Sequence, residues 1–202
     1  VYLSTNNGST WTQTALNNRT VLSLAISENN IFTATYQYGV YLSTNNGSTW
    51  TQTAMNHNDV TCLAIIGNNI FAGTGNGVYL STNNGTNWTQ TALNNKTVSS
   101  LTIIGNNIFA GTYQYGVYLS TNNGTIWTQT SLNNFWVRSL AIIGNNIFAG
   151  TEESGVWLST NNGTSWTQTA LNNKSVLSLA ISGNNIFAGA NSGVYLSTNN
   201  GL

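Results

Sequence analysis

Residues Val1–Gly8 read VYLSTNNG, and nearly the same eight letters return at Val40, Val78, Val117, Val156 and Val194. The spacings between successive copies are 39, 38, 39, 39 and 38 residues. A period in this range is typical of repeat proteins, in which each unit buries its apolar face against its neighbours. We therefore expect residues 1–202 to form a single domain, with repeats that start near residues 1, 40, 78, 117 and 156 and a partial repeat from 194.

Each repeat predicts four short antiparallel strands. In the third repeat Val98–Ile104 is an almost continuous apolar and small-residue run, as expected of a strand that is buried on both faces. A Gly-Asn-Asn turn leads to a second strand at Ile108–Thr112, and a variable tip leads to a third at Val117–Thr121. An Asn-Asn-Gly turn, which is a strong hairpin signal, then leads to an outer strand at Trp127–Thr130.

Four antiparallel strands in about 40 residues, repeated radially, predict an all-β fold of the β-propeller type. One inner strand per blade gives a five-bladed β-propeller, with inner strands at Val21–Ser27, Val60–Ile66, Val98–Ile104, Val137–Ile143 and Val176–Ser182. A β-solenoid is the alternative, but it needs shorter and more regular coils.

The two ends of the chain predict how such a ring closes. The last repeat stops after its second strand (Asn185–Ala190) and third strand (Val194–Thr198), so we expect Thr10–Ala15 to supply its outer strand. Val1–Thr5 and Val194–Thr198 are then the same strand competing for one place. One of them should fray or pair with a neighbouring molecule, which would be a strand exchange between copies.

Composition limits the partners of this protein. Hydrophobic residues make up 40% of the chain, enough for a sizeable core, whereas charged residues make up only 4% and the net charge is zero. Binding to a nucleic-acid backbone needs several clustered Lys and Arg side chains, so we expect no nucleic-acid partner. No apolar run approaches the roughly 18 residues of a membrane span, so we expect no membrane insertion.

The turn STNNGSTW at Ser4–Trp11 and Ser43–Trp50 resembles the Asp-box, Ser-x-Asp-x-Gly-x-Thr-Trp, of sialidase-type (BNR) repeat β-propellers. Related copies stand at Ser81–Trp88, Ser120–Trp127 and Ser159–Trp166. The chain departs from that pattern because Asn replaces the Asp, at Asn6, Asn45, Asn83, Asn122 and Asn161. The resemblance implies a structural turn between the third and fourth strands, away from the active face. This agrees with the turn chemistry of Asn and Gly.

The resemblance does not extend to sialidase activity. Sialidases of this blade type use three arginines, and this chain has two, Arg19 and Arg138. The single histidine, His57, and the single cysteine, Cys62, lie in a loop and a strand, without the oriented base that a nucleophilic pair needs. We therefore expect no catalytic residues, no metal site and no cofactor.

Differences between the repeats concentrate in two sets of loops, which an up-and-down blade places on one face. One set joins an outer strand to the next blade, and the other joins the second strand to the third. The sharpest candidate ligand-binding patch combines aromatic and charged residues from adjacent blades: Tyr113, Tyr115, Phe135, Trp136, Arg138 and Glu152. Aromatic faces beside polar groups suit a sugar ring or a protein interface, and loops on a rigid scaffold commonly carry recognition. Drift of loop tips that little packing depends on is the competing interpretation.

The sequence thus favours a non-catalytic binding or scaffold module that binds glycans or another protein through its variable loop face. An extracellular or cell-surface location suits such a module. The alternative is a structural-only repeat protein, recently amplified or designed, with no selected ligand. Near-identical repeats favour this alternative, whereas uneven changes such as Phe135-Trp136 and Glu152-Glu153 favour a natural history.

Overall fold

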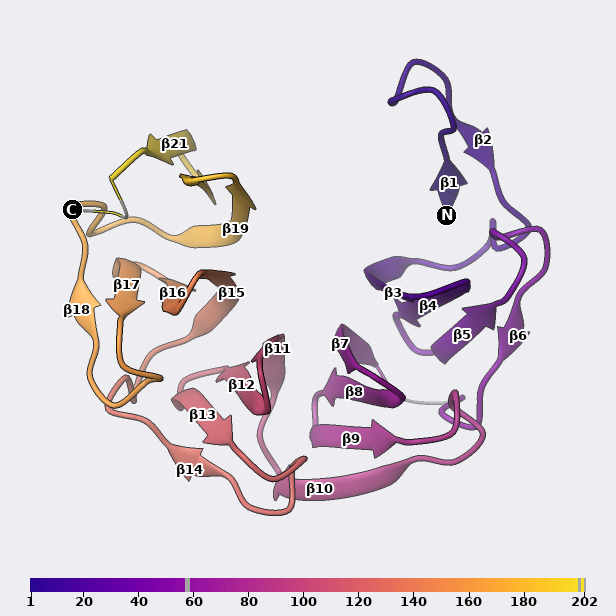
Figure 1. The fold of residues 1–202 in the computed structure, drawn as a ribbon, viewed down its shortest axis with the longest axis horizontal. Helices are drawn as coiled ribbons and strands as arrows, with labels where there is room; N and C mark the ends of the chain where they lie inside the picture. Colours follow the sequence, from indigo (N-terminus) through magenta and orange to yellow (C-terminus); the bar gives the residue numbers. More distant parts are fainter. Residues whose placement is uncertain (57–58, 200, 202) are drawn as a thin grey trace.

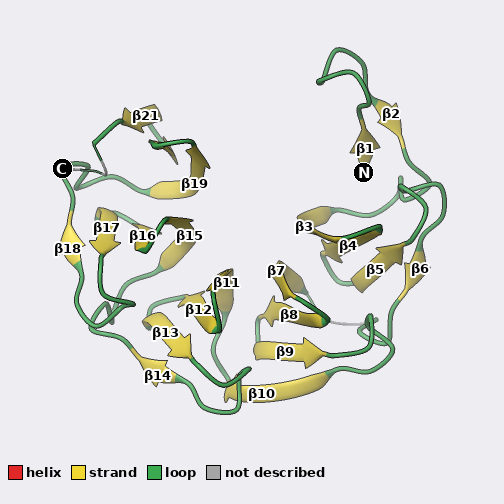
Figure 2. Cartoon of the chain, viewed as in Figure 1, coloured by secondary structure: helices red, strands yellow, loops and turns green. Residues whose placement is uncertain are grey.

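The computed structural model describes residues 1–56, 59–199 and 201. Within these residues every regular element is a β-strand, as Figure 2 shows. The strands form five sheets and one separate two-stranded hairpin. The sheets stand side by side around an open arc (Figure 1).

Each complete sheet runs from an inner strand to an outer strand. The N-terminal hairpin consists of β1 (Tyr2–Leu3) and β2 (Thr12–Gln13). The first sheet consists of β3 (Val21–Ser27), β4 (Asn30–Thr35), β5 (Gly39–Ser43) and β6 (Thr51–Gln52). The second consists of β7 (Val60–Ile66), β8 (Asn69–Thr74), β9 (Gly77–Ser81) and β10 (Thr89–Asn94). The third consists of β11 (Val98–Ile104), β12 (Asn107–Thr112), β13 (Gly116–Ser120) and β14 (Thr128–Gln129). The fourth consists of β15 (Val137–Ile143), β16 (Asn146–Thr151), β17 (Gly155–Ser159) and β18 (Thr167–Gln168). The fifth consists of β19 (Val176–Ser182), β20 (Asn185–Ala190) and β21 (Gly193–Ser197).

The strand predictions are confirmed. All pairings are antiparallel between chain neighbours, so each sheet is a simple meander. The five inner strands have the bounds that the repeat pattern predicts, because their apolar runs end at the conserved turns. The outer strand β14 is shorter than the predicted Trp127–Thr130, since it keeps only two residues in ladder pairing with β13.

The hydrophobic core lies between the sheets. Between the third and fourth sheets it contains Phe109 and Val117 from one side and Leu140 and Ile147 from the other, all buried. Equivalent clusters fill the other inter-sheet spaces. Complete burial of one such side chain contributes about 1.5–3 kcal/mol. Stacking of repeats, rather than any single sheet, therefore provides the core.

The Asn-Asn-Gly turns are structural, as their residue types predict. In the third sheet Ser120 Oγ accepts a hydrogen bond from the N–H of Gly124 at 2.9 Å, and Asn122 Oδ1 accepts one from the N–H of Ile126 at 2.9 Å. Asn123 and Gly124 take φ values of 54° and 82°, a left-handed region that Asn and Gly tolerate. The side chains of the turn thus satisfy its own backbone.

The same turns also join neighbouring sheets. The Ala92 N–H, at the end of the second sheet, donates to the carbonyl of Gly124 at 3.1 Å. Trp127 Nε1 donates to Thr91 Oγ1 of the second sheet at 3.2 Å. Two further Trp–Thr bonds repeat this arrangement, from Trp88 to Thr53 and from Trp166 to Thr130. Each turn therefore fixes the outer edge of the sheet before it.

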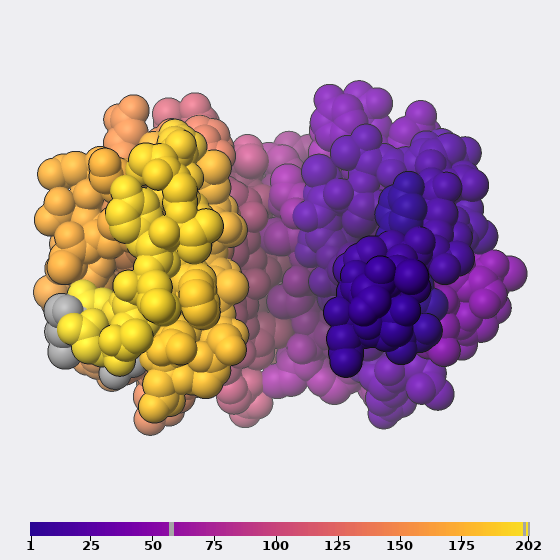
Figure 3. All heavy atoms as spheres, turned by 90° about the horizontal axis from the view of Figure 1, so that it is seen from above, coloured from indigo at the N-terminus to yellow at the C-terminus, as the bar shows by residue number. Residues whose placement is uncertain are grey.

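The predicted closure of the ring is not seen. Instead of completing the last sheet, β2 pairs with β1, with Tyr2 opposite Gln13 and Leu3 opposite Thr12. The fifth sheet has three strands and β21 is its edge. Because β1 and β21 have the same sequence, the nearby β1 can hold the place beside β2 while closing a far shorter loop. Figures 1 and 3 show the resulting open space between the N-terminal hairpin and the C-terminal sheet.

Candidate functional site

The two sets of variable loops lie on one face of the arc, as predicted, and they also contact each other. In the third sheet the Tyr113 N–H donates to the carbonyl of Thr97 at 2.9 Å. In the fourth sheet the Glu152 N–H donates to the carbonyl of Trp136 at 2.9 Å. A further bond crosses between sheets, from the Glu153 N–H to Ser175 Oγ at 3.2 Å. The strand ends thereby hold the loop residues in fixed positions.

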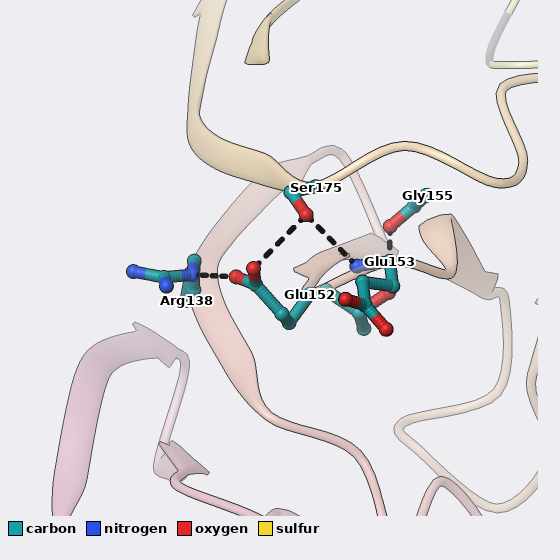
Figure 4. A network of polar contacts seen from close by, with 6 residues as sticks. Arg138, Glu152, Glu153, Gly155 and Ser175 are labelled. Carbon is teal, nitrogen blue, oxygen red and sulfur yellow. Dashed lines mark hydrogen bonds and ion pairs between the residues drawn. The ribbon is translucent and has the colours of Figure 1, made fainter. Parts of the chain in front are cut away.

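Four of the six predicted site residues form one connected group, which we call the aromatic–ion cluster: Tyr113, Trp136, Arg138 and Glu152. The rings of Tyr113 and Trp136 meet edge to face with centroids 4.7 Å apart. The guanidinium carbon of Arg138 lies 3.6 Å from the centroid of the Trp136 ring. Arg138 Nε is also paired with the Glu152 carboxylate (Figure 4). Tyr113 follows β12, Trp136 precedes β15, Arg138 lies within β15 and Glu152 follows β16.

The fifth sheet anchors the acidic end of the cluster. Ser175, which precedes β19, donates from Oγ to Glu152 Oε1 at 3.0 Å (Figure 4). The hydrogen bond from Arg138 holds the pKa of the Glu152 carboxyl below its ordinary value of 4.5, against the opposing effect of burial, and the bond from Ser175 adds to the lowering. Glu152 is therefore ionised at neutral pH and its charge is balanced within the cluster.

Two of the predicted site residues lie apart from the cluster. Phe135 turns toward Trp157 of the neighbouring strand, with ring centroids 5.2 Å apart, and packs against the buried core of the third and fourth sheets. Tyr115 is exposed and lies under Lys96, whose Nζ is 3.8 Å from the ring centroid. Phe135 thus contributes to packing, while Tyr115 belongs to a second aromatic–cation pair on the same face.

Sequence reasoning missed Ser175 and Lys96. Both occupy the loop that precedes an inner strand, which is one of the two loop sets that the repeat comparison identified as variable. Their positions were therefore visible in the sequence, but their partners were not, because the partners lie in other loops. A third pair of this kind places Arg19 over Tyr38 at 3.9 Å. A hydrogen bond from Arg19 to the Tyr41 hydroxyl raises the pKa of Arg19.

The remaining reactive side chains do not add to this site. Burial raises the pKa of the Cys62 thiol to about 12, so it is protonated at neutral pH. His57 lies outside the described residues. Among the residues that the structure describes, no group of three or more His, Cys, Asp or Glu side chains could hold a metal ion. Nor does that part of the chain contain a helix long and apolar enough to cross a membrane.

A groove of about 450 Å³ lies at the C-terminal end of the arc, and no residue of the aromatic–ion cluster lines it. Its lining is mainly apolar and includes Phe148, Ile186 and Tyr195.

No protein-family model matches this chain, and no curated protein matches it significantly. Among solved structures, it is similar to an ancestral GH74 enzyme, with 25% sequence identity and a TM-score of 0.72 over 88% of this chain and 28% of that one. It is also similar to the extracellular domain of a one-component system from B. thetaiotaomicron, with 22% identity and a TM-score of 0.79 over 95% of this chain and 28% of that one.

A third similar structure is YCF48 from Cyanidioschyzon merolae, with 15% identity and a TM-score of 0.73. That match covers 96% of this chain and 75% of YCF48. The chain therefore spans little more than a quarter of the first two structures and three quarters of the third. Together these likenesses show that the chain has a β-propeller-like, repeated all-β fold.

Proposed function

We propose that this protein is a non-catalytic binding module that recognises neutral carbohydrate through the aromatic–ion cluster on its variable loop face. The observation that carries the proposal is the Tyr113–Trp136 pair with Arg138 stacked behind it. Tyr113 is 39% exposed, and Trp136 holds it edge-on. A rigid, exposed ring is a suitable platform for the apolar face of a sugar.

The charges of the cluster favour a neutral ligand. Arg138 and Glu152 form an ion pair without net charge, and Ser175 donates a hydrogen bond to the other carboxylate oxygen of Glu152. An anionic or cationic ligand would therefore have to break an existing ion pair. Asn and Gln side chains of the neighbouring loops, such as Gln114 and Asn134, offer uncharged donors and acceptors for sugar hydroxyls.

The structural neighbours support the same proposal at a coarse level. They include a GH74 enzyme and the extracellular domain of a one-component system. A carbohydrate-related role outside the cell or at its surface is consistent with these neighbours. The whole chain has only four Lys and Arg residues, so the proposal includes no nucleic-acid partner.

A second candidate function is purely structural. Cations cover three aromatic rings of the loop face, at Tyr38, Tyr115 and Trp136. Such pairs stabilise exposed loops by about 0.5–1 kcal/mol each. This recurrence favours a repeat scaffold in which the cations and aromatic rings of the loops pair with one another and bind no selected ligand. A protein partner at the same face is the third alternative.

Binding to an array of neutral oligosaccharides, including β-glucan and xyloglucan fragments, tests the proposal, followed by calorimetry on any ligand found. Tyr113→Ala and Trp136→Ala should each weaken binding by about tenfold or more, since central aromatic contacts commonly contribute at least that much. Tyr36→Ala is the matched control, because Tyr36 occupies the equivalent loop position of the first sheet, where no Trp follows in the next loop. Absence of binding across the array by the folded protein would favour the structural alternative.

A further inference from the structure

Two kinds of contact recur at the interfaces between neighbouring sheets in the arc. Between the third and fourth sheets, Gly111 faces Val137, and a Cβ at Gly111 would lie 2.7 Å from Val137 Cγ1. Across the same interface the Leu140 N–H donates to Ser100 Oγ at 3.0 Å. Equivalent contacts join the other sheets: Gly73 with Val98, Gly150 with Val176, Leu63 with Ser23 and Leu179 with Ser139. Each sheet thus has a forward face and a rear face. In the third, fourth and fifth sheets the forward face carries the Gly and Ser and the rear face carries the Val and Leu, whereas Ala34 replaces the Gly in the first sheet and Cys62 replaces the Ser in the second.

Within the described part of the chain, no sheet packs against the forward face of the C-terminal sheet. Val194 and Leu196 are 75% and 57% exposed, whereas Val117, the counterpart of Val194 in the third sheet, is fully buried. The atoms nearest to a Cβ at Gly189 belong to Ser178 of the same sheet, and not to a valine of a following sheet. This end of the arc therefore carries the forward half of a repeat interface.

The first sheet presents the complementary rear face. Leu24 and Ile26 of β3 are 53% and 69% exposed, whereas Leu140, the counterpart of Leu24, is 8% exposed. Val21 is only half-buried, although its counterparts in the four following sheets are completely buried. The segment after β2 contacts the first sheet, where the Ala15 N–H donates to the carbonyl of Gly47 at 3.3 Å, but the side chains of Leu24 and Ile26 stay exposed.

The groove at the C-terminal end has the composition of an indole site. Inside the array Trp166 packs against the cluster of Phe109, Val117, Ile147 and Ala149 and donates to Thr130. The C-terminal groove is lined by the counterparts of those residues one repeat later: Phe148, Val156, Ile186, Ala188 and Thr169. At the other end of the chain Trp11 is 63% exposed. The groove and Trp11 are thus the two separated halves of a contact that the array makes repeatedly.

We propose that a second copy of this chain binds head to tail, with its Trp11 in the groove of about 450 Å³ and its β3 against the forward face of β19–β21. Strand β2 of the second copy becomes the outer strand of the fifth sheet and pairs with β21. In the second copy β1 is released from β2, because β21 of the first copy takes its place. Release of β1 is favoured over release of β21, because β1 has two ladder pairs and β21 has five. The interface is heterologous and can continue through further copies.

The geometry of the arc favours a second copy over the chain's own N-terminus. Four closely packed interfaces set the rotation from sheet to sheet, and packed interfaces resist continuous deformation. With that rotation the two ends stand apart, as the space-filling view shows (Figure 3). Joining the chain's own ends would require the packing at these interfaces to change.

Disulfide trapping tests the proposal in the intact 202-residue chain. Two variants are made in a Cys62→Ser background, one with Gly189→Cys and one with Val21→Cys. Serine suits position 62, because the other repeats have serine at the equivalent position (Ser23, Ser100, Ser139 and Ser178). A side chain also fits at position 189, because the first sheet has Ala34 at the equivalent position. Inside the array the equivalent Val Cβ lies 3.1–3.2 Å from the Gly Cβ position, close to disulfide geometry.

Mixing the two variants under mild oxidation should give a covalent heterodimer. Adding Trp11→Ala to the Val21→Cys variant should reduce its yield, while the matched change Tyr2→Ala, on the released strand, should not. Sedimentation velocity of the unmodified chain should show concentration-dependent association, which Trp11→Ala weakens by about thirtyfold or more.

Two results would overturn the proposal. The first is a double variant, Val21→Cys with Gly189→Cys, that forms only an internal cross-link at every concentration, which would show closure of the chain on itself. The second is a folded protein that stays monomeric and yields no cross-link in either format.

Discussion

At the residue scale, the loop face is organised by pairing cations with aromatic rings. Three of the four Lys and Arg residues in the chain lie over a ring, and among the described residues Arg138 is the one that is also paired with an acid. This additional ion pair links the fourth sheet to the fifth through Ser175. The comparison between repeats identified the residues of the cluster because they lie in or beside the loops that differ from repeat to repeat. It could not find the orientation of their rings, which separated Phe135 from the group.

The lowered pKa of Glu152 predicts a pH dependence of stability. Arg138 lowers the folded-state pKa below the ordinary value of 4.5, so the ion pair adds stability above about pH 4.5. That stability is lost as the pH falls through the lowered folded-state pKa, because the unfolded chain then binds a proton more readily than the folded one. Urea unfolding between pH 7 and pH 3 should therefore show a larger loss for the unmodified protein than for Glu152→Gln. Parallel pH profiles for the two proteins would contradict this account.

At the element scale, the Asn-Asn-Gly turn has a role beyond its own hairpin. Its Gly carbonyl and its Trp indole both bind the sheet before it. The internal turn geometry was predictable from Asn and Gly, since it depends on residues four apart. The contacts with the preceding sheet were not, because Thr91 and Trp127 meet only after two sheets have stacked.

The Trp–Thr hydrogen bonds can be tested with a contrast that the chain itself offers. Trp127→Phe removes the bond to Thr91 and should cost about 1 kcal/mol beyond the loss of packing. Trp50→Phe should cost less or be neutral, because Trp50 Nε1 is buried without a hydrogen-bond partner. Thr14 occupies the position relative to Trp50 that Thr91 occupies relative to Trp127, but its hydroxyl donates to the carbonyl of Val1 at 3.1 Å. The measurement is the urea midpoint of each variant, and equal losses would contradict the assigned role of the bond.

At the scale of the whole molecule, stability is shared between neighbouring sheets and falls toward the ends. Strands β12 and β16 have a packed sheet on both sides, whereas β2 and β21 lie at the open ends of the arc. In a stacked array each unit is stabilised mainly by its neighbours.

Hydrogen exchange at low protein concentration should therefore be slowest in β12 and β16 and fastest in β2 and β21. At high concentration, protection should increase selectively in β2, β3 and β21, where the head-to-tail contact forms. Uniform protection at all concentrations would indicate that neither end is open in solution.

The sequence by itself determined the repeating unit, its strands and turns, and the face on which differences collect. These depend on contacts within about 40 residues, where apolar runs and Asn-Gly turns act locally. Only the tertiary structure decided how the ends behave. Val1–Thr5 and Val194–Thr198 have the same sequence, so the prediction of a closed ring left open which of them occupies the one available place, and in the structure β1 lies beside β2. The rotation fixed by packing between sheets keeps the ends apart, so the short hairpin of β1 and β2 forms and the interface halves at both ends remain exposed.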